Sequence, residues 1–86
     1  MFYTYILKQD DADHFYVGFT SNLKHRVLEH AEGATKSTSG RKWTLYCYFS
    51  FTDEKTARNF EIYLKTGSGR AFSKRRFGFK VDEALA

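Results

Sequence analysis

Two short tyrosine motifs near the start of this 86-residue chain are followed by three isolated polar residues that could act with them. The motifs are Tyr3-Thr4-Tyr5 and Tyr16-Val17-Gly18, and the later residues are Arg26, His30 and Glu61. Phenol, guanidinium and imidazole groups can orient water, grip a phosphate and relay a proton, while a carboxylate can hold a divalent cation. The set is suited to cutting a phosphodiester, and its order and spacing carry that inference because each residue type alone is common.

The arginine and histidine lie four residues apart in a segment that is predicted to be helical. Arg26 and His30 therefore share one helix face, while Leu23 and Val27 lie on the neighbouring face that is expected to meet a sheet. A guanidinium at this edge could bind a phosphate bidentately and stabilise charge in a transition state. The alternative to this functional interpretation is that Arg26 is an ordinary surface arginine and His30 a structural histidine.

Glu61 interrupts the apolar stripe of a second predicted helix. Ala57, Phe60 and Leu64 form the stripe, and Glu61 falls inside it. A carboxylate there is costly unless a cation, a metal or hydrogen bonds compensate it. A Mg²⁺ site with one carboxylate, waters and substrate phosphate oxygens would fit. The alternative is a border glutamate that pairs with a nearby lysine or arginine.

The elements that must position these residues follow from hydrophobic periodicity and turn signals. Two strands over Phe2–Lys8 and Phe15–Thr20 form a predicted hairpin, and Ser21 or Asn22 caps a helix over Leu23–Glu32. A mobile basic loop over 34–42 precedes a strand over Trp43–Phe51. A helix over Glu54–Lys65, capped by Thr52 or Asp53, stops at Gly67, and Ala71–Phe77 forms a last helix or turn.

This order predicts an α/β (α+β) sandwich with one three-stranded antiparallel sheet flanked by helices. In the third strand, alternate residues are expected to face one core: Trp43, Leu45, Cys47, Phe49 and Phe51. One domain is expected over residues 1–80, with 81–86 as a frayed tail, since 42% hydrophobic residues suffice for a single core.

Cysteine usage and hydropathy indicate a cytoplasmic protein. The single cysteine, Cys47, lies in an apolar run and is expected to be a buried thiol in a reduced compartment, which excludes a disulfide framework. We find no signal-peptide-like segment and no run of membrane-spanning length, so no membrane partner is expected.

Positive charge is concentrated in the C-terminal part of the chain. Residues 1–35 hold three basic and five acidic side chains, whereas residues 36–86 hold eleven basic and five acidic ones. A polyanionic partner is the physical interpretation, because neutralised phosphates release counterions. A solvated basic face is the alternative. The candidate nucleic-acid-binding residues are Lys36, Arg41, Lys42, Arg70, Lys74, Arg75 and Arg76.

Together, the two tyrosine motifs, the arginine eight residues after Gly18, the histidine four residues later and the glutamate in Ala57-Arg58-Asn59-Phe60-Glu61 resemble the GIY-YIG nuclease domain. The resemblance covers Phe2 to about Phe77. The run from Tyr63 to Arg70 is similar to small single-domain bacterial members, which are akin to the N-terminal nuclease of the excision-repair incision subunit. The resemblance implies five catalytic residues, Tyr5, Tyr16, Arg26, His30 and Glu61, with Glu61 as the metal ligand.

The resemblance also implies a mechanism of metal-assisted hydrolysis of DNA. Glu61 would hold Mg²⁺ or Mn²⁺, Arg26 would clamp the phosphate, and Tyr16 would position the attacking water. A phenol is a weak base at neutral pH, so His30 or Tyr5 would relay the proton. The chain departs from the family where Tyr3 and Thr4 replace glycine and isoleucine, and where Gly67-Ser68-Gly69-Arg70 replaces a frequent asparagine. At the second departure either Arg70 or Ser68 substitutes for the asparagine, or the site is weak.

Three function classes remain open at this point. A nuclease of DNA repair or recombination would be structure-dependent or weakly specific, with targeting left to a protein partner. A non-catalytic binding module would grip nucleic acid through the basic C-terminal stretch and exposed aromatics such as Phe72 or Phe77. A structural domain would use the tyrosines as ordinary strand residues. The choice between DNA and RNA and the oligomeric state do not follow from the sequence.

Overall fold

The computed structural model describes residues 1–10, 14–31 and 42–78, and these hold one antiparallel sheet and three helices. The elements, in chain order, are β1 (Phe2–Gln9), β2 (Phe15–Thr20), α1 (Leu23–Ala31), β3 (Trp43–Phe51), α2 (Glu54–Leu64) and α3 (Gly67–Phe77). The predicted order and fold class are confirmed. The predictions for the loop at 34–41 and for the tail at 81–86 lie outside the described residues.

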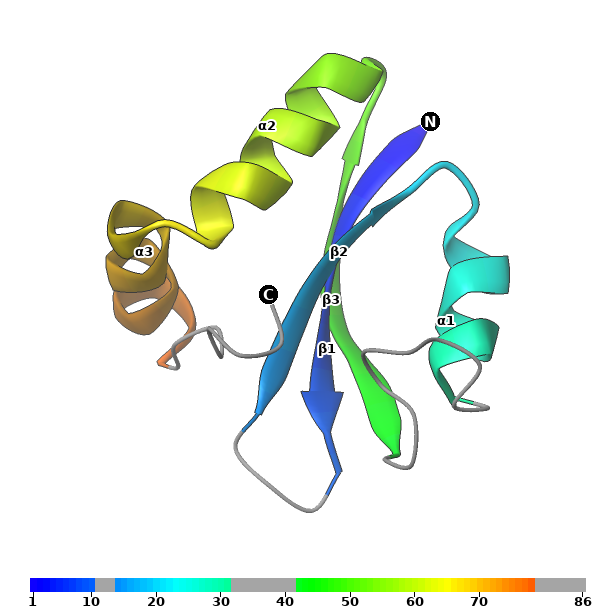
Figure 1. Ribbon diagram of the computed structural model, residues 1–86, viewed down its shortest axis with the longest axis horizontal. Coiled ribbons are helices and arrows are strands. Elements are labelled where there is room, and N and C mark those ends of the chain that lie inside the picture. The colour runs from blue at the N-terminus through cyan, green and yellow to red at the C-terminus, as the bar shows by residue number, and fades with distance from the viewer. Residues whose placement is uncertain (11–13, 32–41, 79–86) are drawn as a thin grey trace.

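The sheet has the strand order β2-β1-β3, so β1 is central. Helix α1 covers one face, and α2 and α3 cover the other, as Figure 1 shows with α1 on the right and the other two on the left. A central strand covered on both faces must be apolar on both sides. Tyr5, Ile6 and Leu7 are accordingly buried, and so is Thr4, whose hydroxyl donates a hydrogen bond to Ala57 O of α2 (2.6 Å).

A break in the register divides the third strand between the two faces. Ile6 pairs with Cys47 and Leu7 with Leu45, so the register skips Tyr46. Such a bulge reverses the alternation of the residues beyond it. The prediction that all five alternate residues of this strand face one core is therefore wrong, because Trp43 and Leu45 pack on the α1 side and Cys47 and Phe49 pack on the other.

Two cores result, one on each face of the sheet. Under α2 and α3, the buried core residues are Ile6, Phe15, Val17 and Leu64, with Phe49, Phe60, Phe72 and Phe77 packed against them. Under α1, Tyr5, Leu7 and Trp43 are buried, with Tyr16, Leu23 and Leu45 against them. The α1 core is rich in tyrosine, and it is the core that carries the site.

Side-chain caps fix where the helices begin. Asn22 Oδ1 accepts a hydrogen bond from His25 N (3.2 Å), and Asp53 Oδ2 accepts one from Thr56 N (2.7 Å). The structure therefore selects Asn22 and Asp53 from the two pairs of predicted caps. The backbone N–H of Gln9 donates to His14 O (2.9 Å), which closes the hairpin between β1 and β2.

Helix α3 begins earlier than the sequence predicts. Gly67 does not simply end α2, because it is the first residue of α3, whose N-cap Thr66 accepts a hydrogen bond from Gly69 N (3.1 Å). At Gly69, a Cβ atom would overlap the Tyr63 carbonyl and the Leu64 Cα. The glycines thus permit a second helix to pack tightly against the end of the first, where their low helix propensity had suggested a stop.

Cys47 is a free, half-buried thiol that packs against the core under α2 and α3. Burial raises the pKa of this thiol to about 11, so it is protonated and unreactive at neutral pH. Among the described residues, no helix is long and apolar enough to cross a membrane.

The close approach at Gly69 generates a stability prediction. Gly69→Ala should lower the free energy of unfolding by about 2–3 kcal/mol, because the added methyl group meets backbone rather than a movable side chain. The matched control is Gly67→Ala in the same helix turn, where a Cβ would have nothing within 4 Å. Urea unfolding of both variants checks this, and equal stabilities would contradict the packing described here.

Candidate active site

Tyr5 enters the site from the central strand. Its side chain points to the α1 face and lies across Gly18 of β2, where a Cβ atom would overlap the Tyr5 ring and hydroxyl. Only glycine leaves room for this crossing. The Tyr5 side chain is fully buried, and its hydroxyl lies 2.8 Å from Nε2 of His30.

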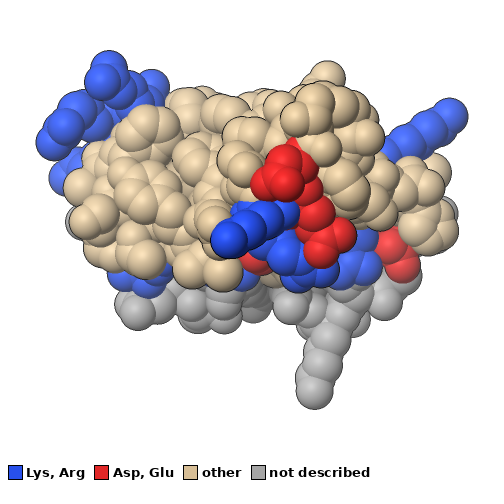
Figure 2. Space-filling model, turned by 90° about the horizontal axis from the view of Figure 1, so that it is seen from above, with Lys and Arg blue, Asp and Glu red and all other residues tan. Residues whose placement is uncertain are grey.

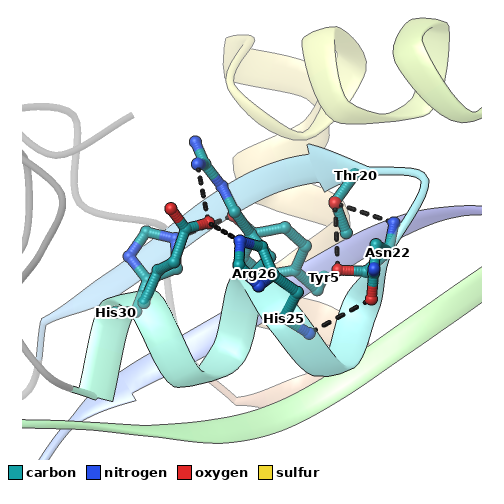
Figure 3. A network of polar contacts seen from close by, with 7 residues as sticks. Tyr5, Thr20, Asn22, His25, Arg26 and His30 are labelled. Atoms are coloured by element: carbon teal, nitrogen blue, oxygen red, sulfur yellow. Dashed lines mark hydrogen bonds and ion pairs between the residues drawn. The ribbon is translucent and has the colours of Figure 1, made fainter.

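His30 is the most deeply buried side chain of α1 described. Its ring centroid lies 5.7 Å from that of Tyr5 and 5.0 Å from that of Tyr16. Figure 3 shows the imidazole and the Tyr5 phenol pointing toward each other between helix and sheet. The expectation that Leu23 lies on the face that meets the sheet is confirmed, since Leu23 packs against the core under α1. The expectation that His30 points to the edge of the core is wrong, because its side chain is 0% exposed.

Burial holds the Tyr5 and His30 pair neutral. It raises the pKa of Tyr5 to about 12, although the Arg26 guanidinium acts in the opposite direction. Burial, aided by the positive charge of Arg26, lowers the pKa of His30 to about 4. At neutral pH the hydroxyl keeps its proton and the imidazole has one nitrogen available as an acceptor, so Tyr5 can donate to Nε2.

Arg26 stands at the rim of this buried pair. Its side chain is 38% exposed, and Nη1 lies 3.3 Å from Glu29 Oε1, one helix turn away. Interaction with the Tyr5 hydroxyl raises the pKa of Arg26. Its Nε is buried and has no hydrogen-bond partner among the described residues. An anion could reach only the exposed part of the guanidinium, because Nε itself is buried.

Tyr16 is the partly exposed tyrosine of the cluster. Its ring lies against Tyr5, His30 and Trp43, the last at 6.4 Å between centroids. No hydrogen bond joins its hydroxyl to another described residue. The phenol is therefore held by ring packing while its polar end stays available. The indole Nε1 of Trp43 is buried and also lacks a hydrogen-bond partner in the described part of the chain.

Glu61 lies on α2, which packs on the face of the sheet opposite α1 and contacts β2, an edge strand. Arg58, three residues before it on the same helix face, lies 4.3 Å over the ring of Phe19 in β2. The negative charge of Glu61 contributes to the raised pKa of Tyr5, which indicates that the two groups are near each other. Glu61 Oε2 lies 2.8 Å from Lys65 Nζ, so the alternative of a border glutamate with a lysine partner holds for the unliganded chain.

One side of this carboxylate suits a hard divalent cation. Only Oε2 of Glu61 is hydrogen-bonded among the described residues, which leaves Oε1 as an anionic oxygen ligand. The described ranges contain no group of three histidine, cysteine or acidic residues that could enclose a metal. This donor set fits Mg²⁺ or Mn²⁺ bound by one carboxylate with waters and substrate, and does not fit a closed zinc site.

The candidate nucleic-acid-binding residues are spread over the molecule. Lys74, Arg75 and Arg76 are exposed in the last turn of α3, Arg70 is half-buried in its first turn, and Lys42 is exposed just before β3. Lys36 and Arg41 lie outside the described residues. Helix α3 lies across the sheet from α1, so its basic turn is not part of the tyrosine cluster.

Two further predictions concern residues on α3 and its first turn. Phe72 and Phe77 were expected to be exposed aromatics in a binding module, but both pack against the core under α2 and α3. That expectation is wrong because the bulge in β3 turns an apolar surface toward this helix. Ser68 and Arg70, suggested as substitutes for a missing asparagine, both belong to the first turn of α3.

Sequence reasoning missed three residues that support the site. Glu29 holds Arg26 and also lies 3.6 Å from His25, Lys65 holds Glu61, and Trp43 packs against Tyr16. The charged residues had a signal in the sequence, because spacings of three and four place them beside their partners on a helix. Trp43 had none, because its contact depends on the bulge.

Comparisons with known proteins show which family the chain resembles. The model of the family described as the GIY-YIG catalytic domain matches residues 1–76. The chain is also similar to the UPF0213 protein ORF82 of Orgyia pseudotsugata multicapsid polyhedrosis virus. The two are 40% identical over 74 residues, which cover 83% of this chain and 70% of the viral protein. No solved structure gives a significant match.

The buried neutral imidazole should make stability depend on pH. Because the pKa of His30 falls from an ordinary ~6.5 when unfolded to about 4 when folded, the unfolded chain binds more protons between these values. Stability is therefore lost as the pH falls from 6.5 to 4, by roughly 2 kcal/mol from this group. Urea unfolding at pH 7, 5.5 and 4 measures it, and His30→Gln should flatten the slope. Equal slopes in both proteins would contradict a buried neutral His30.

Proposed function

This chain belongs to the GIY-YIG catalytic domain family, a family of nucleases, and we propose that it is a metal-dependent endonuclease that hydrolyses DNA phosphodiester bonds. The family expected from the tyrosine motifs is confirmed by the match over residues 1–76 and by the viral relative. The narrower likeness to bacterial members and to the excision-repair nuclease stays a prediction.

The observation that carries the proposal is the meeting of four side chains from three elements on the α1 face of the sheet, near a carboxylate of α2 whose charge acts on Tyr5. Tyr5 from β1, Tyr16 from β2, and Arg26 and His30 from α1 approach one another there, and the carboxylate is that of Glu61. A buried Tyr–His pair with perturbed pKa values beside a partly exposed arginine is the kind of titratable cluster that functional sites contain.

We assign the direct contacts with substrate to the accessible members of the set. Arg26 would bind a non-bridging oxygen of the scissile phosphate and offset the charge that develops there. Tyr16 would orient the attacking water through its hydroxyl. Tyr5 and His30 are fully buried, so their proposed role is to fix Tyr16 and Arg26 rather than to touch the phosphate. With pKa values of about 12 and about 4, neither readily exchanges a proton at neutral pH.

Glu61 is the residue that would hold Mg²⁺ or Mn²⁺. When bound, such an ion neutralises charge on the phosphate and on the leaving 3′ oxygen. The carboxylate is well placed for this because α2 keeps it only 19% exposed, close to the tyrosine cluster. A partly desolvated carboxylate binds a cation more strongly than one in bulk water.

Weak or structure-dependent selection of DNA is the proposed specificity. Viewed from above, the described surface has basic side chains at both ends and a mixed acidic and basic group between them (Figure 2). This face lacks the continuous basic stripe expected for tight binding along a duplex. We propose that cutting serves DNA repair or recombination in the cytoplasm, with a protein partner supplying the targeting.

The metal role of Glu61 can be tested with an isosteric change. Glu61→Gln should reduce Mg²⁺- or Mn²⁺-dependent cleavage by at least about 100-fold, because the amide cannot neutralise the cation. Labelled duplex, single-stranded, flapped and branched DNA, each with metal and with EDTA, are the substrates. Glu54→Gln, an exposed position on the same helix, is the control and should cut normally. Salt-sensitive binding without cutting by the wild type would favour the binding module instead.

The basic turn of α3 gives a second, independent test. Arg75→Gln with Arg76→Gln should weaken DNA binding and reduce the slope of log affinity against log salt by up to ~2, since two phosphate contacts are lost. The charge-conserving pair Arg75→Lys with Arg76→Lys should keep the wild-type slope. Fluorescence anisotropy between 50 and 200 mM salt measures both slopes. An unchanged slope in the glutamine variant would remove this turn from the DNA surface.

A further inference from the structure

Lys65 stands at the metal-binding carboxylate but has no role in the mechanism given above. It directly follows α2 as the C-cap residue, and its backbone N–H donates to Ile62 O (3.1 Å). Its position on the helix is therefore fixed by the backbone. The side chain turns back by four residues, so that Nζ lies 2.8 Å from Glu61 Oε2.

This ion pair differs from the others between described residues. It is the shortest of them, and its side chains are only 30% and 19% exposed. The other pair on α2, Arg58 with Glu54, is 3.2 Å long and more than half exposed on both sides. Exposed pairs of that kind contribute little, whereas a partly buried pair is screened less by water and salt. Lys65 therefore holds Glu61 more firmly than an ordinary surface lysine would.

A divalent cation and Lys65 cannot both bind Glu61 without cost. A cation on Oε1 would stand within a few ångströms of the ammonium on Oε2, and like charges at that separation repel strongly outside bulk water. The lysine side chain is partly exposed at the end of the helix, so it has room to leave. A DNA phosphate at the same edge offers it a replacement anion.

We infer that Lys65 is a positioning residue that couples metal binding to DNA binding by exchanging the Glu61 carboxylate for a backbone phosphate of the substrate. Without DNA, Lys65 occupies Glu61 and weakens the binding of a metal ion. With DNA, the ammonium moves to a phosphate and leaves the carboxylate to the metal. This inference rests on the proposed function, because it needs Glu61 to be the metal ligand and DNA to lie at the β2 edge.

The coupling must be reciprocal, because metal and DNA change each other's affinity for the protein by the same factor. If DNA removes Lys65 from Glu61 and so tightens metal binding, the metal must tighten DNA binding by the same factor. Lys65→Met removes the ammonium and keeps most of the apolar stem. It should therefore raise the metal affinity of the DNA-free protein and reduce the mutual enhancement between metal and DNA.

The experiment measures Mn²⁺ binding to the full chain by electron paramagnetic resonance, without DNA. Lys65→Met should bind Mn²⁺ roughly three- to tenfold more tightly than the wild type. Lys65→Arg, which keeps the charge, should bind as the wild type does. Lys55→Met is the matched control, because it removes one positive charge from an exposed position of the same helix. Circular dichroism and thermal melting confirm that each variant is folded.

A second arm measures DNA affinity with and without Mn²⁺ in a Tyr16→Phe background, in which cutting is suppressed. Mn²⁺ should tighten binding of a branched duplex less in the Lys65→Met variant than in its parent. Mn²⁺ affinity that is unchanged in Lys65→Met, or raised equally in Lys55→Met, would overturn the coupling while leaving a wild-type nuclease intact. A wild type that neither binds Mn²⁺ nor cuts DNA would overturn the proposed function as well.

Discussion

The placement of one phenol, that of Tyr5, underlies the arrangement of the candidate site. A tyrosine on the central strand would ordinarily be confined to the space above its own strand. Here the neighbouring residue on β2 is Gly18, and the missing side chain lets the ring cross that strand to its edge. The hydroxyl then needs a partner in a dry environment, and His30 supplies it at 2.8 Å. His30 in turn packs against the ring of Tyr16, and the Tyr5 hydroxyl interacts with the Arg26 guanidinium.

The two-faced sheet is the condition that makes this possible. Helix α1 has only a modest apolar surface, so most of the apolar packing lies on the opposite face, where α2 and α3 cover a core of phenylalanines. That core stabilises the sheet, and the α1 face is left to hold polar groups. A buried imidazole costs stability below its ordinary pKa, and such costs are tolerable where another part of the fold supplies the stability. The bulge at Tyr46 lets one strand contribute to both cores. Trp43 and Leu45 pack in the core under α1, and Cys47 and Phe49 pack in the core under α2 and α3.

Charge at the site is balanced within the chain before any ligand binds. Arg26 forms an ion pair with Glu29, and Glu61 forms one with Lys65, each about one helix turn away. Such local pairs keep the side chains ordered, and a phosphate or a cation that binds at the site has to displace one partner of each pair. The chain as a whole carries a formal charge of +4, yet acidic and basic side chains lie side by side on the face seen in Figure 2. Binding of a polyanion then depends on rearranging short ion pairs as well as on the net charge.

Local patterns in the sequence determined the order of the elements and their bounds to within a few residues, and the resemblance to a nuclease family supplied the five proposed site residues. Alternation, cap residues and helical spacing are properties of neighbouring residues, so they can be recognised without knowledge of the fold. Three features depended on tertiary structure. The division of β3 between two cores depends on a register with β1, the extension of α3 to Gly67 depends on close packing against Tyr63, and the burial of His30 depends on the phenol that crosses Gly18. Each is a contact between segments distant in sequence or between packed elements, and its energy comes from burial and steric fit that only the folded chain creates.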